Sequence, residues 1–275
     1  MKQFLKSILA THFKEVYFWQ QSYRFRRQTK KKFWDFQNWV KEKLFGSDPI
    51  KILSGPFVGL KYYNRVVWGP ITPKWIGCYE EELHDIVNKI IEYQYDIIID
   101  VGAAEGYYAV GLAKSCTNSI VYSFDIDPFA RELQKELASI NKISNLVVGT
   151  YCDHRNLDSL IHAERKNLII CDIEGFEYYL LNPKEVHKIL CSDILVEIHP
   201  FDYDGIHIDI NQMALILIDR FNITHEIKQI EIANKEVQRY RDLLRNLSET
   251  EMINAMNEYR LSGQKWLWIR KKTPN

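Results

Sequence analysis

The sequence predicts an α/β protein with a doubly wound, Rossmann-like sheet of seven strands and helices on both faces. First, short apolar runs alternate with amphipathic helical patterns from residue 79 onward. Second, most of these runs are apolar throughout, which is typical of parallel strands covered on both faces. Third, the stretch DIIIDVGAAEGYYAVGLA (96–113) passes from a buried strand through two glycines directly into a helix.

The individual elements follow from these patterns in chain order. Runs rich in Ile, Val and aromatic residues indicate strands, and apolar residues three and four positions apart indicate helices. Asp127 before Pro128 is a typical helix N-cap, and Ser248 to Glu251 form a capping box. The expected strands are 95–100, 119–125, 145–152, 167–172, 193–199, 223–230 and 265–271, and the expected helices are 80–91, 107–114, 128–140, 154–164, 176–181, 182–190 and 210–221.

Composition divides the chain into three parts. Residues 1–48 are a basic, aromatic, helical arm, residues 49–78 are a Gly- and Pro-rich connecting segment or small β-lobe, and residues 79–275 are the α/β domain. Through Ser54 there are twelve Lys or Arg and four Asp or Glu, a net charge of +8 in a chain whose total is zero. We interpret the arm as amphipathic helices that dock on the domain; binding to nucleic acid or to an anionic membrane surface is the alternative.

Cysteine usage and the first residues indicate the compartment. The five cysteines are odd in number, lack a CxxC spacing and mostly lie in apolar runs, so we expect reduced thiols. The apolar run at residues 1–19 is interrupted by Lys6, His12, Lys14 and Glu15, and is too short and too charged for a secretory signal or a membrane span. We therefore expect a cytoplasmic protein.

The loop after Asp100 is the candidate cofactor site. Gly102 and Gly106 let the backbone turn sharply at the carboxyl edge of the sheet, where ligands bind in open α/β folds. Asp125 ends the next strand 19 residues after Gly106, where a ribose-binding carboxylate is expected. The loop reads GAAEG, without the GxGxxG of pyrophosphate binders, and its acidic residue favours a ligand with ribose and a cationic tail, S-adenosylmethionine. The expected cofactor contacts are Asp100, Gly102, Ala103, Glu105, Gly106, Tyr107, Asp125, Ile126, Asp153 and Asp172.

Five sequence strings extend this interpretation. IGCYEEEL, DVGAAEGYYAVGLA, VYSFDIDP, LIICDIEGFE and ILVEIHP occur in this order between residues 76 and 200. Together they resemble the FkbM-type family of class I S-adenosylmethionine-dependent methyltransferases, with a weaker similarity in EYRLSGQKWLWI (258–269). The resemblance implies a class I methyltransferase sheet and O-methylation of a sugar or other metabolite hydroxyl. The chain departs from the family at residues 104 and 105, where an Asn is common, and this affects contacts to the methionine tail.

Four residues are candidates for the transfer chemistry. Asp172 ends one strand with Glu174 just after it, and Glu197 and His199 lie on one face of the next strand, so all four can converge at the carboxyl edge. One interpretation makes His199 or a carboxylate the general base; another has them hold a divalent cation that activates the acceptor hydroxyl. A third has Glu197 and His199 satisfied by backbone groups at the strand end. We expect His199 to be the leading base, no bound metal, and transfer that is insensitive to chelators.

The residues between the last two strands, 233–264, are expected to be helical and to cover the acceptor pocket. Arg239, Arg241 and Arg245 there lie on a solvated face or bind an anionic acceptor. The favoured function is methylation of a glycan or small-molecule hydroxyl. The alternatives are an RNA-directed methyltransferase that uses the basic arm and a non-catalytic, Rossmann-like adenosine-binding protein.

Overall fold

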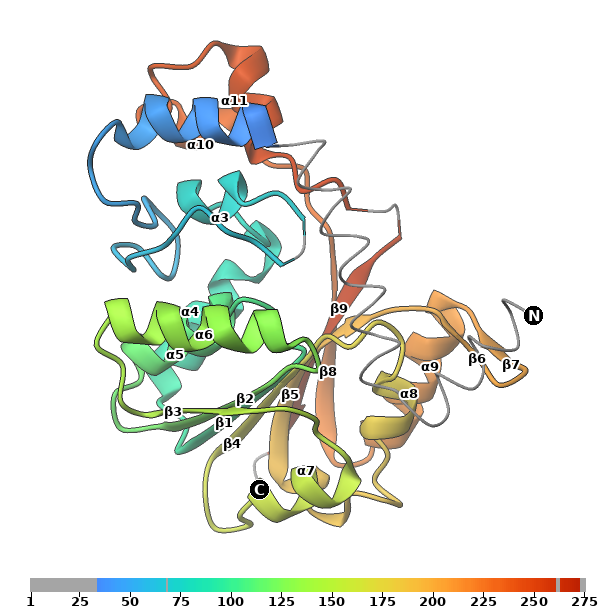
Figure 1. Cartoon of the computed structure of the whole chain (residues 1–275). Coiled ribbons are helices and arrows are strands. Elements are labelled where there is room, and N and C mark those ends of the chain that lie inside the picture. Colours follow the sequence, from blue (N-terminus) through green and yellow to red (C-terminus); the bar gives the residue numbers. More distant parts are fainter. Residues whose placement is uncertain (1–33, 68, 261–262, 273–275) are drawn as a thin grey trace, which may run out of the picture.

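The central feature of the computed structural model is one seven-stranded sheet, in the order β3-β2-β1-β4-β5-β9-β8 (Figure 1). The structure describes residues 34–67, 69–260 and 263–272. The five strands from β3 to β5 are mutually parallel, whereas β9 runs antiparallel to both of its neighbours, so that β8 is again parallel to β5. The predicted doubly wound sheet of seven strands is therefore confirmed.

The strands lie close to the predicted ranges. They are β1 Ile97–Val101, β2 Ile120–Phe124, β3 Leu146–Gly149, β4 Asn167–Cys171, β5 Ser192–Ile198, β6 Phe201–Tyr203, β7 Ile206–Ile208, β8 His225–Glu231 and β9 Lys265–Lys271. The helices are α3 Thr72–Ile76, η1 Glu81–Leu83, α4 His84–Tyr93, α5 Tyr107–Ser115, α6 Pro128–Ile140, α7 His154–Leu160, α8 Glu177–Leu180, η2 His187–Cys191, α9 Ile210–Phe221, α10 Val237–Tyr240 and α11 Glu249–Met256.

Helices cover both faces of the sheet, as Figure 1 shows. Strand β1 illustrates the division: Ile98 packs into the cluster formed with α4, α5 and α6, while Ile97 and Ile99 pack into the cluster formed with α7, α8 and α9. Every residue of β1, β4 and β5 is buried, which explains why their sequences are apolar without alternation. The Asp127 side chain accepts a hydrogen bond from the Phe129 N–H and so begins α6 as predicted.

The structure corrects several predicted elements. Residues 182–190 are turns and the short 3₁₀ helix η2, because the Asn182-Pro183 pair sets a turn where a helix was expected. Among the described residues between Ala233 and Gln264, helices are limited to α10 and α11, with the predicted capping box at the start of α11. The hairpin β6–β7 was missed; its turn holds Asp204 and Gly205 at φ of 54° and 78°, the Asp-Gly signal of a tight hairpin.

The segment 49–78 packs on the α/β domain. The regular structure of its described residues is one bridge between Lys51 and Lys61 and the helix α3, which fits a connecting segment better than a β-lobe. Its buried side chains, such as Phe57 and Trp75, belong to the same core cluster as α5 and α6. The segment therefore completes the core on that side of the sheet.

Residues 34–45 are helical and lie beside α10 and α11 (Figure 1). Val40 is fully buried in a cluster with Leu244, Met252 and Met256. This part of the arm docks on the chain itself, as predicted, while residues 1–33 lie outside the described range. None of the helices among the described residues combines the length and apolar composition that crossing a membrane requires.

Candidate functional site

The loop after β1 turns sharply at the carboxyl edge of the sheet. Gly102 has φ of +87°, and a Cβ added there would lie 1.7 Å from the carbonyl oxygen of Asp172. The loop backbone therefore touches the end of β4 at a distance that only glycine allows. Gly106, also at positive φ, is the N-cap residue of α5, so the first N–H groups of that helix lie at the same edge.

Asp125 lies against this loop, as the sequence predicts for a ribose-binding position. Its carboxylate accepts hydrogen bonds from the Ala104 N–H at 2.9 Å and the Asp127 N–H at 2.8 Å. The Arg131 guanidinium donates to the Asp125 carbonyl oxygen at 2.8 Å. The end of β2 is thereby fixed beside the glycine loop.

The Glu105 side chain points away from solvent into the connecting segment. It is completely buried, forms an ion pair with Lys74, and accepts hydrogen bonds from the Tyr62 hydroxyl at 3.3 Å and the Val67 N–H at 3.2 Å. These contacts join segment 49–78 to the loop. The sequence suggested that Glu105 is a free acid in the cofactor loop, but Lys74 neutralises its carboxylate. Glu105 can therefore contact a cofactor only through its backbone.

The other predicted cofactor residues surround the same edge. Asp100 is buried; burial, together with the nearby charge of Asp125, raises its pKa to about 7. The Tyr107 ring is buried edge-on against Phe57. Asp153 caps α7 by accepting from the Asn156 N–H at 2.8 Å. Ala103 is buried and Ile126 is half-buried.

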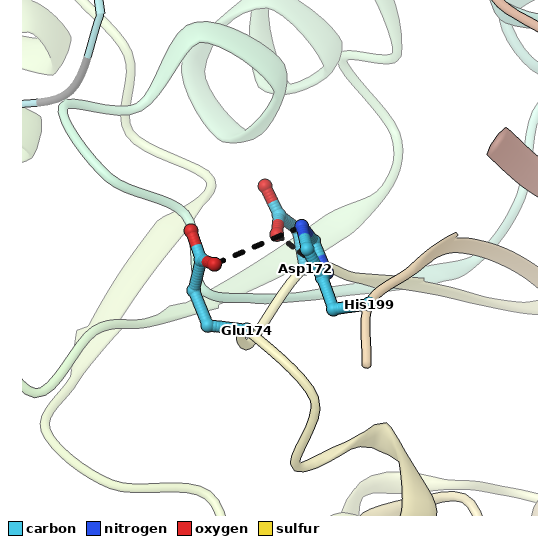
Figure 2. Close-up of side chains that lie close together, drawn as sticks. All are labelled: Asp172, Glu174 and His199. Carbon is cyan, nitrogen blue, oxygen red and sulfur yellow. Dashed lines mark ion pairs between the residues drawn. The ribbon is translucent and has the colours of Figure 1, made fainter. Parts of the chain in front are cut away.

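Three of the predicted transfer residues meet at the ends of β4 and β5, as Figure 2 shows. His199 lies 3.8 Å from Asp172 (Nδ1 to Oδ1) and 3.8 Å from Glu174 (Nε2 to Oε2). The meeting follows from the sheet, because β4 and β5 are adjacent and parallel. A tight turn after β4 completes it: Gly175 has φ of +103°, and a Cβ there would lie 2.5 Å from the Pro200 carbonyl oxygen.

Two buried carboxylates complete the surroundings of His199. Glu197 Oε2 lies 3.8 Å from Nε2, and Glu177 Oε1 lies 3.4 Å from Nδ1. Burial lowers the pKa of His199, but the hydrogen bond and charge of Glu177, with Glu197 and Glu174, outweigh it and raise that pKa to about 9. Burial and the charge of Glu174 raise the pKa of Asp172 well above its usual range. All four residues that the sequence singles out for transfer thus lie together at this edge of the sheet, and their roles stay predictions.

Arg260 is a site residue that sequence reasoning missed. It pairs with Glu197 and approaches Glu82 at 3.0 Å and Glu80 at 3.4 Å, with its side chain only 12% exposed. Its partner Glu197 is 63 positions earlier in the chain, which gives no local sequence signal. Glu177 was missed as well, although an acid beside the apolar positions of a short helix is a usable signal.

The sequence matches no family model and no curated protein. Among solved structures, the chain is similar to the O-methyltransferase TomG from Streptomyces achromogenes, which is involved in tomaymycin synthesis and was solved with SAM. The identity is 9% and the TM-score 0.47 over 72% of this chain and 82% of TomG. It is also similar to an rRNA methylase from Streptococcus thermophilus, with 16% identity and a TM-score of 0.44 over 70% of this chain and 97% of the other. A third similar structure is TYW2 from M. jannaschii in complex with AdoMet, with 14% identity and a TM-score of 0.43 over 70% and 74%.

Proposed function

We propose that this protein is an S-adenosylmethionine-dependent methyltransferase that methylates a hydroxyl group of a sugar, a glycan or a small metabolite. One observation carries the proposal. The glycine loop after β1, the acid after β2 and the acidic cluster after β4 and β5 are separate in sequence, yet they occupy one edge of the sheet. Open α/β sheets bind their ligands at this edge.

The residues at this edge fit the cofactor. The loop offers a close backbone approach at Gly102, and the N-terminus of α5 begins beside it. One buried carboxylate oxygen of Asp100 has no hydrogen-bond partner among the described residues, and a ligand donor would satisfy it. Asp125 is the residue for the ribose hydroxyls, at the end of the adjacent strand β2. When bound, S-adenosylmethionine supplies an electrophilic methyl group.

The acceptor hydroxyl would lie over Asp172, Glu174 and His199. Carboxylates can accept a hydrogen bond from the hydroxyl and orient its lone pair, and orientation supplies most of the rate of such a transfer. The surrounding carboxylates raise the pKa of His199 to about 9, so the ring must release a proton before it can accept one from the hydroxyl. The role of His199 as general base stays a prediction.

Cofactor binding tests the proposal directly. We expect S-adenosylmethionine and its demethylated product to bind in isothermal titration calorimetry and to raise the melting temperature. At a free ligand concentration of ~100 times Kd, the free energy of unfolding should increase by ~2.7 kcal/mol. Asp125→Ala should weaken binding by the ~1.5–3 kcal/mol of a hydrogen bond to a charged group. Asp219→Ala, which removes an exposed aspartate of α9, is the matched control and should bind normally.

The outcomes separate the alternatives. Stabilisation by NAD in place of S-adenosylmethionine would contradict the proposal. Cofactor binding without transfer to a broad panel of hydroxyl acceptors would favour the non-catalytic adenosine-binding protein. Salt-dependent RNA binding that is lost on deleting residues 1–33, which leaves the docked helix in place, would favour the RNA-directed enzyme.

A further inference from the structure

We propose that Asp172, Glu174 and His199 form a binding site for one divalent cation, with Mn²⁺ as the probe ion. This site differs from the sequence-based expectation of a metal-free base. The proposal is independent of methyl transfer, because the ion would bind whatever the protein catalyses. Only its use, to hold and polarise the acceptor hydroxyl, rests on the proposed function.

The geometry of the three side chains suits a single ion. Each offers one ligand atom, and these atoms all lie within 4.8 Å of one another. If all three separations had this maximum value, the centre of the triangle would lie 4.8/√3, or about 2.8 Å, from each ligand atom. Manganese and magnesium bind oxygen ligands at about 2.0–2.2 Å, so rotations of the half-exposed and exposed carboxylates close the remaining gap. Figure 2 shows the three side chains directed toward a common space.

A buried carboxylate next to the cluster provides the second observation. Glu177 is completely buried, and its Oε1 lies 3.4 Å from Nδ1 of His199. Its Oε2 has no hydrogen-bond partner among the described residues. When a cation displaces the Nε2 proton, a histidine that donates Nδ1–H to a carboxylate presents its Nε2 lone pair to the metal, which is how histidine ligands are held. Nε2 faces Glu174 in this structure.

The local charge balance favours a cation as well. Four carboxylates, those of Asp172, Glu174, Glu177 and Glu197, lie within 4.0 Å of the His199 ring. Arg260 neutralises Glu197, and it also approaches three further acids, Glu80, Glu82 and Glu258. A bound divalent cation would compensate the remaining negative charge in the same place.

The donor set limits the choice of ion. Carboxylates suit Mg²⁺, Ca²⁺ and Mn²⁺, whereas imidazole suits later transition metals, which such a site binds more tightly. Mn²⁺ accepts both kinds of ligand and can be followed spectroscopically, so it is the ion for the test. Water and the acceptor oxygen can fill the other positions.

The test is a titration of chelator-treated, full-length protein with Mn²⁺, in which the spectrum of free Mn²⁺ is followed by electron paramagnetic resonance. We expect one ion per chain. Glu174→Gln and His199→Ala should each weaken binding at least tenfold, and Glu177→Gln should weaken it by ~10–100-fold through the orientation of the ring. The Glu174 side chain is 71% exposed, so its variant will fold.

A second His/Asp pair supplies the control. His207 Nδ1 lies 2.8 Å from Asp202 Oδ1 on the exposed hairpin β6–β7. The double variant Asp202→Ala/His207→Ala should bind Mn²⁺ as the wild type does. Absence of a stoichiometric site, or equal affinity in Glu174→Gln and the wild type, would overturn the proposal. If Mn²⁺ binds and S-adenosylmethionine does not, only the proposed function fails.

Discussion

The buried ion pair between Lys74 and Glu105 gives a quantitative prediction about what fixes the cofactor loop. The two side chains are 4% and 0% exposed. Lys74→Met would leave a buried carboxylate whose remaining partners among the described residues are the Tyr62 hydroxyl and the Val67 N–H. Removing one partner of a buried pair costs about 3–5 kcal/mol. At about 2–4 °C per kcal/mol for a chain of this size, the melting temperature should fall by about 6–20 °C.

A double-mutant cycle tests the reasoning. Replacing both partners, as Lys74→Met/Glu105→Gln, removes both charges and should restore most of the loss, with a coupling energy of at least about 2 kcal/mol. The exposed pair of Arg65 and Glu136, with side chains 43% and 42% exposed, is the control: Arg65→Met should cost less than about 1 kcal/mol. The measurement is urea unfolding of all four cycle members. The reasoning would be refuted if Lys74→Met and Arg65→Met lowered the free energy of unfolding equally. It would also be refuted if the losses of Lys74→Met and Glu105→Gln simply added in the double variant.

Three further predictions concern the loop, the pH dependence and the segment between the last two strands. Gly102→Ala should cost at least about 2 kcal/mol more in urea unfolding than Gly59→Ala, because both glycines have φ above +80° but only the first Cβ meets another atom. Burial raises the pKa of Asp100 above its unfolded value, so the wild type loses stability as pH rises toward about 7. Asp100→Asn should therefore gain up to about 4 kcal/mol relative to the wild type between pH 4 and 8, and a constant difference across that range would contradict this. Ser248→Ala should lower the stability of α11 by about 1 kcal/mol, visible as faster amide exchange there.

Patterns of neighbouring residues were sufficient to predict most of the sheet. Helix α6 begins and ends at the predicted residues because the Asp127-Pro128 start signal and the apolar periodicity are both local. The meeting of Asp172 with His199 was also predictable, because parallel strands end at a common edge.

The remaining features depend on contacts between distant segments. Glu105 looked like a free acid because its partner Lys74 is 31 positions away. The charge state of His199 depends on Glu177, whose position is set by the turn at Gly175 and not by strand periodicity. The hairpin β6–β7 is the exception, since its Asp204-Gly205 signal is local but no strand is among those expected there.

The order of the strands has a consequence for the growing chain on the ribosome. Strand β8 pairs with β9 alone, and β9 lies between β8 and β5. Until β9 has been synthesised, β8 has no neighbour in the sheet, and β5 keeps an open row of backbone hydrogen-bonding groups. Such an open edge attracts other chains. A nascent chain that stalls before residue 265 would therefore have two unsatisfied strands, and we expect it to depend on chaperones until synthesis resumes.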